Sequence, residues 1–240
     1  MTFNKDRTFQ EIFTDTFVFL QQEWRSFFLC IAIYAAPLLA AAHYFSSKII
    51  ITNQLDLVSK EMFTFLVFAA IGYFLLQSIT YCYIACFVQN QNSTPTRQMV
   101  LEFFSKNILT CIKAFLIFGL IFGLGFLMYF IPGLILLAPL SLFVFDKIFT
   151  GTSSMQSLTR SMQLTRSNIS LTYSVVLLSY IASFLFQFFV GSLFSSFPTG
   201  ALILINTAIS VASTSIVYII IALLYFSLRS KIQKPYDNYQ

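Results

Sequence analysis

Six long apolar stretches, separated by short polar segments, run through the whole sequence. Each stretch is continuous and reaches or approaches the ~20 residues that a helix needs to cross a hydrocarbon core of about 30 Å. A transmembrane β-strand needs only ~10 residues and alternates apolar with polar positions, which these stretches do not. The pattern therefore predicts an all-α integral membrane bundle of six transmembrane helices, at Phe27–Phe45, Met62–Val88, Ile108–Phe130, Ile131–Phe149, Ile169–Phe194 and Ala201–Leu228.

The composition agrees with this pattern. Hydrophobic residues make up 58% of the 240 residues and charged residues 10%, whereas about 25% of the residues of a soluble domain are charged. The six spans leave no segment long enough for a soluble domain. We therefore expect a single polytopic membrane domain over residues 1–240, with an N-terminal amphipathic segment at 1–26, the spans within 27–228 and a basic tail at 229–240.

The third and fourth spans form one apolar run that is divided only by Pro132 and Gly133. Proline cannot continue the hydrogen-bond ladder of a helix, and glycine accepts a positive φ angle. The pair therefore predicts a tight hairpin turn between the two spans. Residues 195–200, which also contain proline and glycine, predict a second short turn between the fifth and sixth spans.

The basic residues lie almost entirely on one side of the predicted topology. Of the 14 lysines and arginines, only Lys48 and Lys60 fall in the first loop. The others lie before span 1, in the inner loops or after span 6, except Lys113 and Lys147, which lie near the inner ends of spans 3 and 4. Cytoplasmic loops carry such an excess of lysine and arginine, so we expect both termini in the cytoplasm. The net charge of +5 reflects this topology and contact with anionic headgroups, and nucleic-acid binding is not expected.

Two other interpretations of apolar segments are less well supported. A cleaved signal peptide would explain the first span, but 26 residues that include several acids precede it, whereas the n-region of a signal peptide is short and positive. Cys82 and Cys86 share a helix face, but no histidine or carboxylate accompanies them. We therefore expect these thiols to pack between helices, and we expect neither a metal site nor a cofactor.

Amphipathic segments precede spans 1, 3 and 5. Apolar residues recur there at helical spacing, at Phe9, Ile12, Phe13, Phe17, Leu20 and Trp24, then at Met99, Val100, Phe103 and Phe104 after a cap at Thr94, and last at Met155, Leu158 and Met162. Each segment predicts a helix that lies in the inner interface. A threefold repeat of interfacial helix plus hairpin would explain this pattern, and so would the general tendency of loops beside a bilayer to be amphipathic.

One stretch carries a resemblance to a known family. Phe130-Ile131-Pro132-Gly133 is followed by Asp146 and then by a segment with Ser157-Leu158-Thr159-Arg160-Ser161 and Leu164-Thr165-Arg166-Ser167-Asn168. This order is similar to a bacterial membrane-domain family that includes the membrane region attached to some glycerophosphodiester phosphodiesterases. The resemblance implies a membrane module of a bacterial inner membrane. The catalytic domain of those enzymes is absent, and Ser157 and Ser167 replace the usual alanine and glycine, so no phosphodiesterase activity is implied.

The same stretch supplies candidate binding residues at the inner surface, which are Arg160, Arg166, Asp146 and Asn168. The planar guanidinium of arginine suits phosphate oxygens, so the two arginines predict contact with lipid headgroups or with a membrane-protein partner. A simpler alternative is that Asp146 pairs with Lys147 or Arg160 only to balance charge near the membrane.

A polar stripe in the sixth span indicates a different kind of site. Asn206, Ser210 and Thr214 lie largely on one side of that helix, and Gln77 and Gln187 lie deep within other spans. These residues are candidates for a path taken by a polar solute, or for ordinary hydrogen bonding between helices. Gly119 and Gly123 predict a close helix contact inside the bundle or between the subunits of a homo-oligomer, and His43 has no catalytic partners.

No motif for intramembrane catalysis is present: the sequence lacks His-Glu-x-x-His, Gly-x-Ser-x-Gly and a glycine-rich phosphate loop. We therefore expect no enzymatic activity and no catalytic residues. The favoured hypothesis is a non-catalytic module that associates with membrane lipids or a partner protein. The alternative is a transporter for a small polar or amphiphilic solute, although charged residues typical of ion-coupled carriers are missing from the centre of the bilayer.

Overall fold

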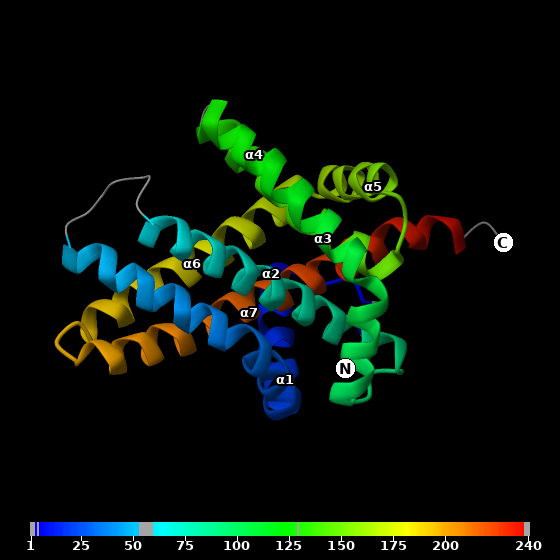
Figure 1. The fold of residues 1–240 in the computed structure, drawn as a ribbon. Coiled ribbons are helices and arrows are strands. Elements are labelled where there is room, and N and C mark those ends of the chain that lie inside the picture. The colour runs from blue at the N-terminus through cyan, green and yellow to red at the C-terminus, as the bar shows by residue number, and fades with distance from the viewer. Residues whose placement is uncertain (1–2, 4, 53–59, 129, 238–240) are drawn as a thin grey trace.

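The computed structural model describes residues 3, 5–52, 60–128 and 130–237, and every regular element within them is a helix (Figure 1). These helices are α1 (Phe9–Thr52), α2 (Lys60–Gln89), α3 (Arg97–Met128), α4 (Phe130–Thr150), α5 (Ser154–Ser167), α6 (Ile169–Leu193) and α7 (Thr199–Asp237). All except α5, which has 14 residues, are long and apolar enough to cross a membrane. The predicted all-α bundle of six spans is confirmed, and the chain is a multi-pass membrane protein.

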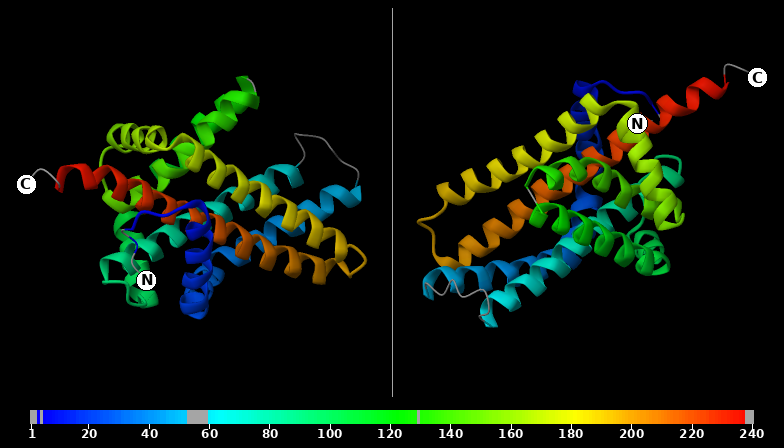
Figure 2. Two further views of the ribbon diagram at one scale, coloured as in Figure 1. Left: turned by 180° about the vertical axis from the view of Figure 1, so that it is seen from behind. Right: turned by 90° about the horizontal axis from the view of Figure 1, so that it is seen from above.

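The amphipathic segment before the first span is part of α1 and not a separate helix. A capping box starts α1: the Thr8 backbone N–H donates to Glu11 Oε2 over 2.7 Å, and the Glu11 N–H donates to Thr8 Oγ1 over 3.4 Å. The helix then continues to Thr52. Its first part is turned sharply against the remainder (Figures 1 and 2), so the segment leaves the direction of the span without ending the helix.

The segments before spans 3 and 5 differ from each other. α3 is continuous with its amphipathic start, and Thr96 Oγ1, not the predicted Thr94, accepts from the N–H of its first turn, at Met99. α5 is the separate helix that the sequence predicts. It begins after a capping box between Ser153 and Gln156, and it ends at Asn168, whose side chain caps α6. Only the third segment therefore forms an independent short helix.

Pro132 and Gly133 do not form the predicted hairpin turn. α4 begins at Phe130, so both residues lie in its first turns, where proline is tolerated because the N–H it lacks has no partner there. Gly133 is buried, and a Cβ added to Gly125 of α3 would meet the Gly133 Cα at 3.3 Å. The pair thus marks a close approach of α3 and α4, and the prediction placed the turn too far along the chain.

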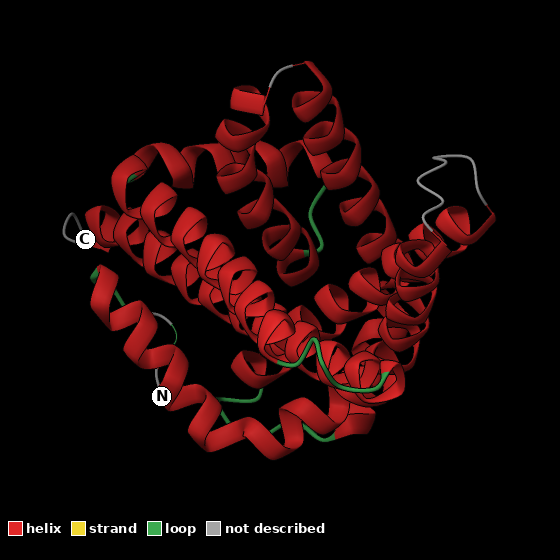
Figure 3. Cartoon of the chain, turned by 90° about the vertical axis from the view of Figure 1, so that its left-hand side faces the viewer, coloured by secondary structure: helices red, strands yellow, loops and turns green. Residues whose placement is uncertain are grey.

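The spanning helices are arranged as antiparallel neighbours. α1 packs along α2 and α7, α6 packs along α7, and the α3–α4 hairpin diverges from the others (Figures 1 and 2). We call the end that holds α5, the α2–α3 connection and the C-terminal part of α7 the basic end. The opposite end, with the end of α1, the start of α2 and the α6–α7 connection, is the far end, which faces the viewer in Figure 3.

The half of the bundle next to the basic end is tightly packed. Every residue of 76–87 in α2, 137–148 in α4 and 217–228 in α7 is buried. Aromatic rings of these runs interlock, as Phe145 does with Tyr81 and Tyr225, each at a centroid distance of 5.1 Å. Helices that are buried on all sides form a continuous core, so this layer closes the basic half.

The faces of α3 and α6 are mostly exposed and apolar, as lipid-facing helices are. In the most apolar part of each helix, 17% of the residues are buried in α3 and α6, against 78% in α7. No described atom outside the helix lies within 4 Å of a Cβ placed at Gly119 or Gly123. These glycines therefore do not serve packing inside the bundle, which leaves a contact between subunits as the interpretation to test.

Candidate functional site

Asp146 lies at the meeting point of three helices at the basic end. Its side chain is fully buried in α4, and its Oδ1 accepts from Tyr225 Oη of α7 over 2.6 Å and from Arg160 Nη1 of α5 over 3.0 Å. Partial burial acts to lower the pKa of Arg160, but the charge of Asp146, the hydrogen bond to it and the neighbouring Tyr225 together outweigh this effect, and the pKa is raised. The ion pair between Asp146 and Arg160, one of the pairings that the sequence allowed, therefore fastens α5 to the core.

The four predicted headgroup- or partner-binding residues do not form one site. Arg160 is held by Asp146, whereas Arg166 is exposed on another part of α5. Asn168 Oδ1 accepts from the Leu171 N–H over 3.2 Å and so caps α6. Arg166 is thus the candidate that remains most open to lipid phosphate, and Asp146 and Asn168 have structural partners within the chain.

A second buried carboxylate, Glu23 of α1, has a similar environment. Its Oε2 accepts from Tyr83 Oη of α2 over 2.7 Å, and its Oε1 accepts from Thr94 Oγ1 in the α2–α3 connection over 2.7 Å. In the sequence, Glu23 is one of the acids that precede the first span, and its burial was not predicted. Its spacing could have indicated this burial, because Glu23 is four residues from both Phe19 and Phe27 and so lies on the same helix face as these buried residues.

The N-terminal segment is also fastened to the bundle by an ionic group. The Arg7 side chain is 1% exposed, and it donates to Asp15 Oδ2 over 2.8 Å and to the Phe3 carbonyl over 2.7 Å. The Arg7 backbone N–H donates to Ser227 Oγ of α7 over 2.9 Å. In the sequence, Arg7 counts only as one of the basic residues that precede the first span, and this role was not predicted.

The far end contains a polar cavity of about 680 Å³ between α1, α6 and α7. This volume lies within the range of about 300–1,000 Å³ of small-molecule sites. Polar side chains from all three helices line it together with aromatic rings, and the lining residues are His43, Ser46, Phe184, Gln187, Phe188, Gly191, Ser192, Ser195, Asn206, Ile209 and Ser210.

A chain of hydrogen bonds crosses the wall of this cavity. Ser210 Oγ donates to Gln187 Oε1 over 3.2 Å, and His43 Nε2 lies 3.3 Å from Ser210 Oγ. The Gln187 amide nitrogen donates to Ser213 Oγ over 3.0 Å and to Ser183 Oγ over 3.2 Å. The network therefore joins α1, α6 and α7 through uncharged groups.

The predicted polar path is brought together only in part. Asn206, Ser210 and Gln187 all line the cavity, whereas Thr214 is half-buried outside the lining and Gln77 is buried in α2. The path does not continue toward the basic end, because the buried layer of α2, α4 and α7 fills that half. His43, which the sequence left without partners, joins the network through Ser210.

A separate, mainly apolar groove of about 480 Å³ lies between α1 and α7. Small residues of α1 line it on either side of Pro37, and Thr207 and Ala208 line it from α7. A proline within a helix removes a backbone hydrogen bond and bends the helix. The groove has no charged residue in its lining.

Among the described residues, no group of three or more histidine, cysteine, aspartate or glutamate side chains has an arrangement that could hold a metal ion. The four cysteines are free and buried, in agreement with the expected packing role.

Comparison with known proteins provides no match from which a function could be inferred, so the function is inferred from the geometry of the site. No family model, no curated protein and no solved structure matches this chain. The converging polar groups of the far-end cavity are therefore the feature on which a functional interpretation depends.

Proposed function

We propose that this chain is a non-catalytic protein of a bacterial inner membrane that binds an amphiphilic or small polar molecule in its far-end cavity. One observation carries the proposal: polar residues from α1, α6 and α7, three of which the sequence singles out, line one cavity of about 680 Å³. Binding sites of membrane bundles are built in this way, from a few convergent polar groups among apolar ones.

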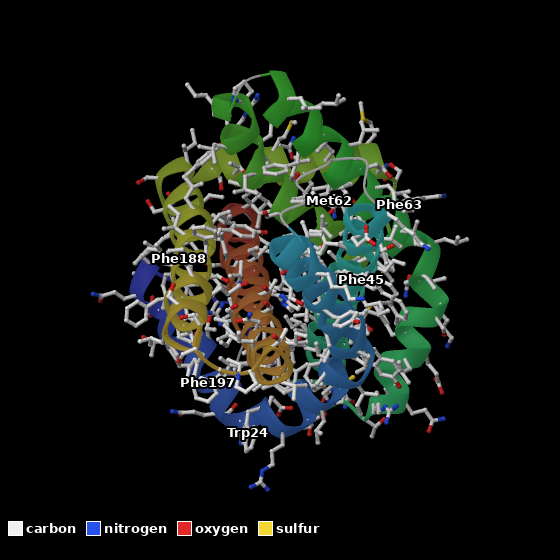
Figure 4. All side chains as sticks on the ribbon, turned by 60° about the vertical axis from the view of Figure 1, so that its left-hand side comes forward. Trp24, Phe45, Met62, Phe63, Phe188 and Phe197 are labelled. Carbon is white, nitrogen blue, oxygen red and sulfur yellow. The ribbon has the colours of Figure 1, made fainter. Side chains whose placement is uncertain are left out.

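The position of aromatic residues favours an amphiphilic ligand. Phe184 and Phe188 line the cavity, yet they are 67% and 68% exposed. Phe188 lies on the outer side of α6 (Figure 4). Exposed phenylalanines on a spanning helix face lipid, so the rim of the cavity is continuous with the acyl-chain region. A molecule with a polar head in the cavity and an apolar part along these rings satisfies both environments.

The orientation follows from the charge distribution. The basic end carries nearly all of the lysines and arginines, and this charge bias supports a cytoplasmic location for that end and for both termini. Trp24, 53% exposed at the basic end (Figure 4), lies against Arg25, and such a pair is typical of the headgroup region. The far-end cavity then opens toward the outer leaflet.

The resemblance to a family of bacterial membrane domains is a second argument for a role as a membrane module. In the stretch similar to the membrane region of glycerophosphodiester phosphodiesterases, the ion pair between Asp146 and Arg160 gives the acidic residue and the first arginine of the motif a common structural role. This pairing supports the relationship. It supplies no catalytic group, which is consistent with a binding function.

Native mass spectrometry of the protein released from its own membrane tests the binding proposal. We expect a small molecule or single lipid class to be retained by the unaltered protein and lost in Asn206→Leu and Ser210→Leu. Thr214→Leu is the matched control, because Thr214 is a polar residue of the same helix outside the cavity lining. Retention that is unaffected by the first two substitutions, or equally reduced by the third, would contradict the proposal.

Transport is the second candidate function. The far end holds the cavity while the basic half is closed by a buried layer, and this arrangement corresponds to one of the two states of an alternating-access carrier. Flux of the retained ligand into proteoliposomes, abolished by Asn206→Leu and Ser210→Leu, would favour it. Binding without flux would assign a receptor or lipid-associated module.

A further inference from the structure

The direction of the hydrogen bonds in the far-end cavity indicates which groups remain for a ligand. The Ser210 hydroxyl has one hydrogen, which it donates to Gln187 Oε1. With this donation made, we infer that Ser210 Oγ accepts from His43, which corresponds to the tautomer of the neutral imidazole with its hydrogen on Nε2. His43 Nδ1 is then an acceptor, and it has no hydrogen-bond partner among the described residues.

Gln187 has no remaining hydrogen to offer. Both hydrogens of its amide nitrogen are used, on Ser183 and Ser213, and its Oε1 accepts from Ser210. Gln187 is therefore a positioning residue, which fixes Ser210 and through it the tautomer of His43. Asn206, one helical turn from Ser210, lines the cavity and is half-buried, and its amide supplies both a donor and an acceptor.

Charge restricts the ligand further. None of the described residues that line the cavity is an aspartate, glutamate, lysine or arginine. Lys48, nearby in sequence on α1, lies over the ring of Tyr44 at 4.7 Å and is not part of the lining. An ionic headgroup would lose its hydration without gaining an opposite charge, which costs several kcal/mol for each ion in practice. An uncharged headgroup avoids this penalty.

We propose that the far-end cavity recognises a neutral, hydroxyl-bearing headgroup of the glycerol or sugar type, which donates to His43 Nδ1 and exchanges hydrogen bonds with the Asn206 amide. A hydroxyl fits because it both donates and accepts, whereas an ester or quinone carbonyl only accepts and leaves Nδ1 unpaired. This inference rests on the proposed function, since it names the ligand class of the same site. The same chemistry occurs in a neutral lipid and in a free polyol.

The test uses probes that share one acyl chain and differ in the headgroup. Protein in nanodiscs of phosphatidylethanolamine and phosphatidylglycerol is titrated with 1-monooleoylglycerol, methyl oleate, oleate and 1-oleoyl-lysophosphatidylglycerol, and bound probe is measured by native mass spectrometry. We expect monooleoylglycerol to bind about tenfold more tightly than each of the other three, the ratio that 1.4 kcal/mol provides. Free glycerol and glucose are added as competitors, and competition at millimolar concentration would identify a free polyol as the source of the headgroup.

Substitutions at the two contact residues complete the test. His43→Phe and Asn206→Leu should each weaken monooleoylglycerol binding about tenfold. His43→Asn should preserve most of the binding, because its amide oxygen can occupy the place of Nδ1, and this variant separates loss of the acceptor from loss of folding. If lysophosphatidylglycerol or oleate binds as tightly, and that binding depends on His43 and Asn206, the ligand class is wrong and the cavity function stands. If no probe depends on these residues, both are overturned.

Discussion

The two halves of this bundle are built from helices of similar apolarity and are held together by different chemistry. In the basic half, two buried carboxylates, Asp146 and Glu23, each accept from a tyrosine hydroxyl within 2.7 Å, and a buried layer surrounds them. In the far half, α1, α6 and α7 are joined by amide, hydroxyl and imidazole groups around a cavity.

This difference indicates which half is able to rearrange. Removing one partner of a buried ion pair costs about 3–5 kcal/mol, whereas hydrogen bonds between membrane helices contribute about 0.6 kcal/mol on average. Charged groups are therefore found where short connecting segments are held against the core, and neutral groups are found around the far-end cavity, where helix contacts are easier to change. The following predictions test this division, in order of decreasing effect.

The largest effect is expected for Arg160→Ala, which leaves the carboxylate of Asp146 buried without an opposite charge. The free energy of unfolding should fall by about 3–5 kcal/mol, measured by equilibrium unfolding in mixed micelles. Arg166→Ala is the control, because Arg166 is exposed on the same helix and should change stability by less than about 0.5 kcal/mol. Equal losses in the two variants would show that the ion pair does not fasten α5.

Tyr83→Phe should have the next largest effect. It removes one of the two donors to Glu23, and a hydrogen bond to a charged group contributes about 1.5–3 kcal/mol. Thr94→Val removes the other donor. Because both donors serve one carboxylate, the double variant should lose more stability than the sum of the single losses. Simple additivity, measured in the same unfolding assay, would mean that the two donors stabilise the protein independently and would contradict their joint action on Glu23.

Two glycine substitutions sharpen the comparison within the far half. A Cβ at Gly72 of α2 would lie 2.8 Å from Leu39 Cδ2 and 3.3 Å from the Leu39 backbone nitrogen, so Gly72→Ala should cost about 1–3 kcal/mol. At Gly191, in the cavity wall, the nearest atom is Asn206 Oδ1 at 3.6 Å, and Gly191→Ala should cost less than about 0.5 kcal/mol. Similar costs at both positions would contradict a loosely packed α6–α7 side.

Among the residues that link helices, Gln187→Leu should have the smallest effect on stability. It removes two hydrogen bonds to α7, to Ser210 and Ser213, and at about 0.6 kcal/mol for each bond between membrane helices the loss should be only about 1 kcal/mol. Ligand retention should nevertheless be lost, because Ser210 and His43 are no longer positioned. A stability loss comparable with that of Arg160→Ala would show that the network is a structural anchor of the bundle.

Much of the fold could be predicted because apolar runs of sufficient length allow only helices in a bilayer. The separate helix α5 was also predictable, since Ser153 and Gln156 form a capping box before a polar segment. The close contact between Gly125 and Gly133 could not be predicted, because a Pro-Gly sequence is compatible with a turn or with the start of a helix. The choice depends on how closely α3 and α4 approach each other.

The candidate site residues could be predicted only where helical spacing alone determines which side chains share a face. Asn206 and Ser210 are one turn apart, so they had to share a face, and both line the cavity. Which neighbour that face meets depends on packing between helices, and for that reason Gln187 joins the site while Gln77 and Thr214 do not. Arg7 and Glu23 were missed because a charge near a membrane is counted first as a topology signal, and burial is a property of the assembled bundle.

Cysteine accessibility tests most directly the claim that the bundle is open at the far end and closed at the basic end. In a background without the native cysteines, Asn206→Cys places a thiol in the cavity and Ser215→Cys places one in the buried part of α7. A membrane-impermeant thiol reagent should label Asn206→Cys from the outer surface of spheroplasts and not in inverted vesicles, and it should not label Ser215→Cys from either side. Labelling of Asn206→Cys from the cytoplasmic surface alone, or of Ser215→Cys from either side, would contradict this account.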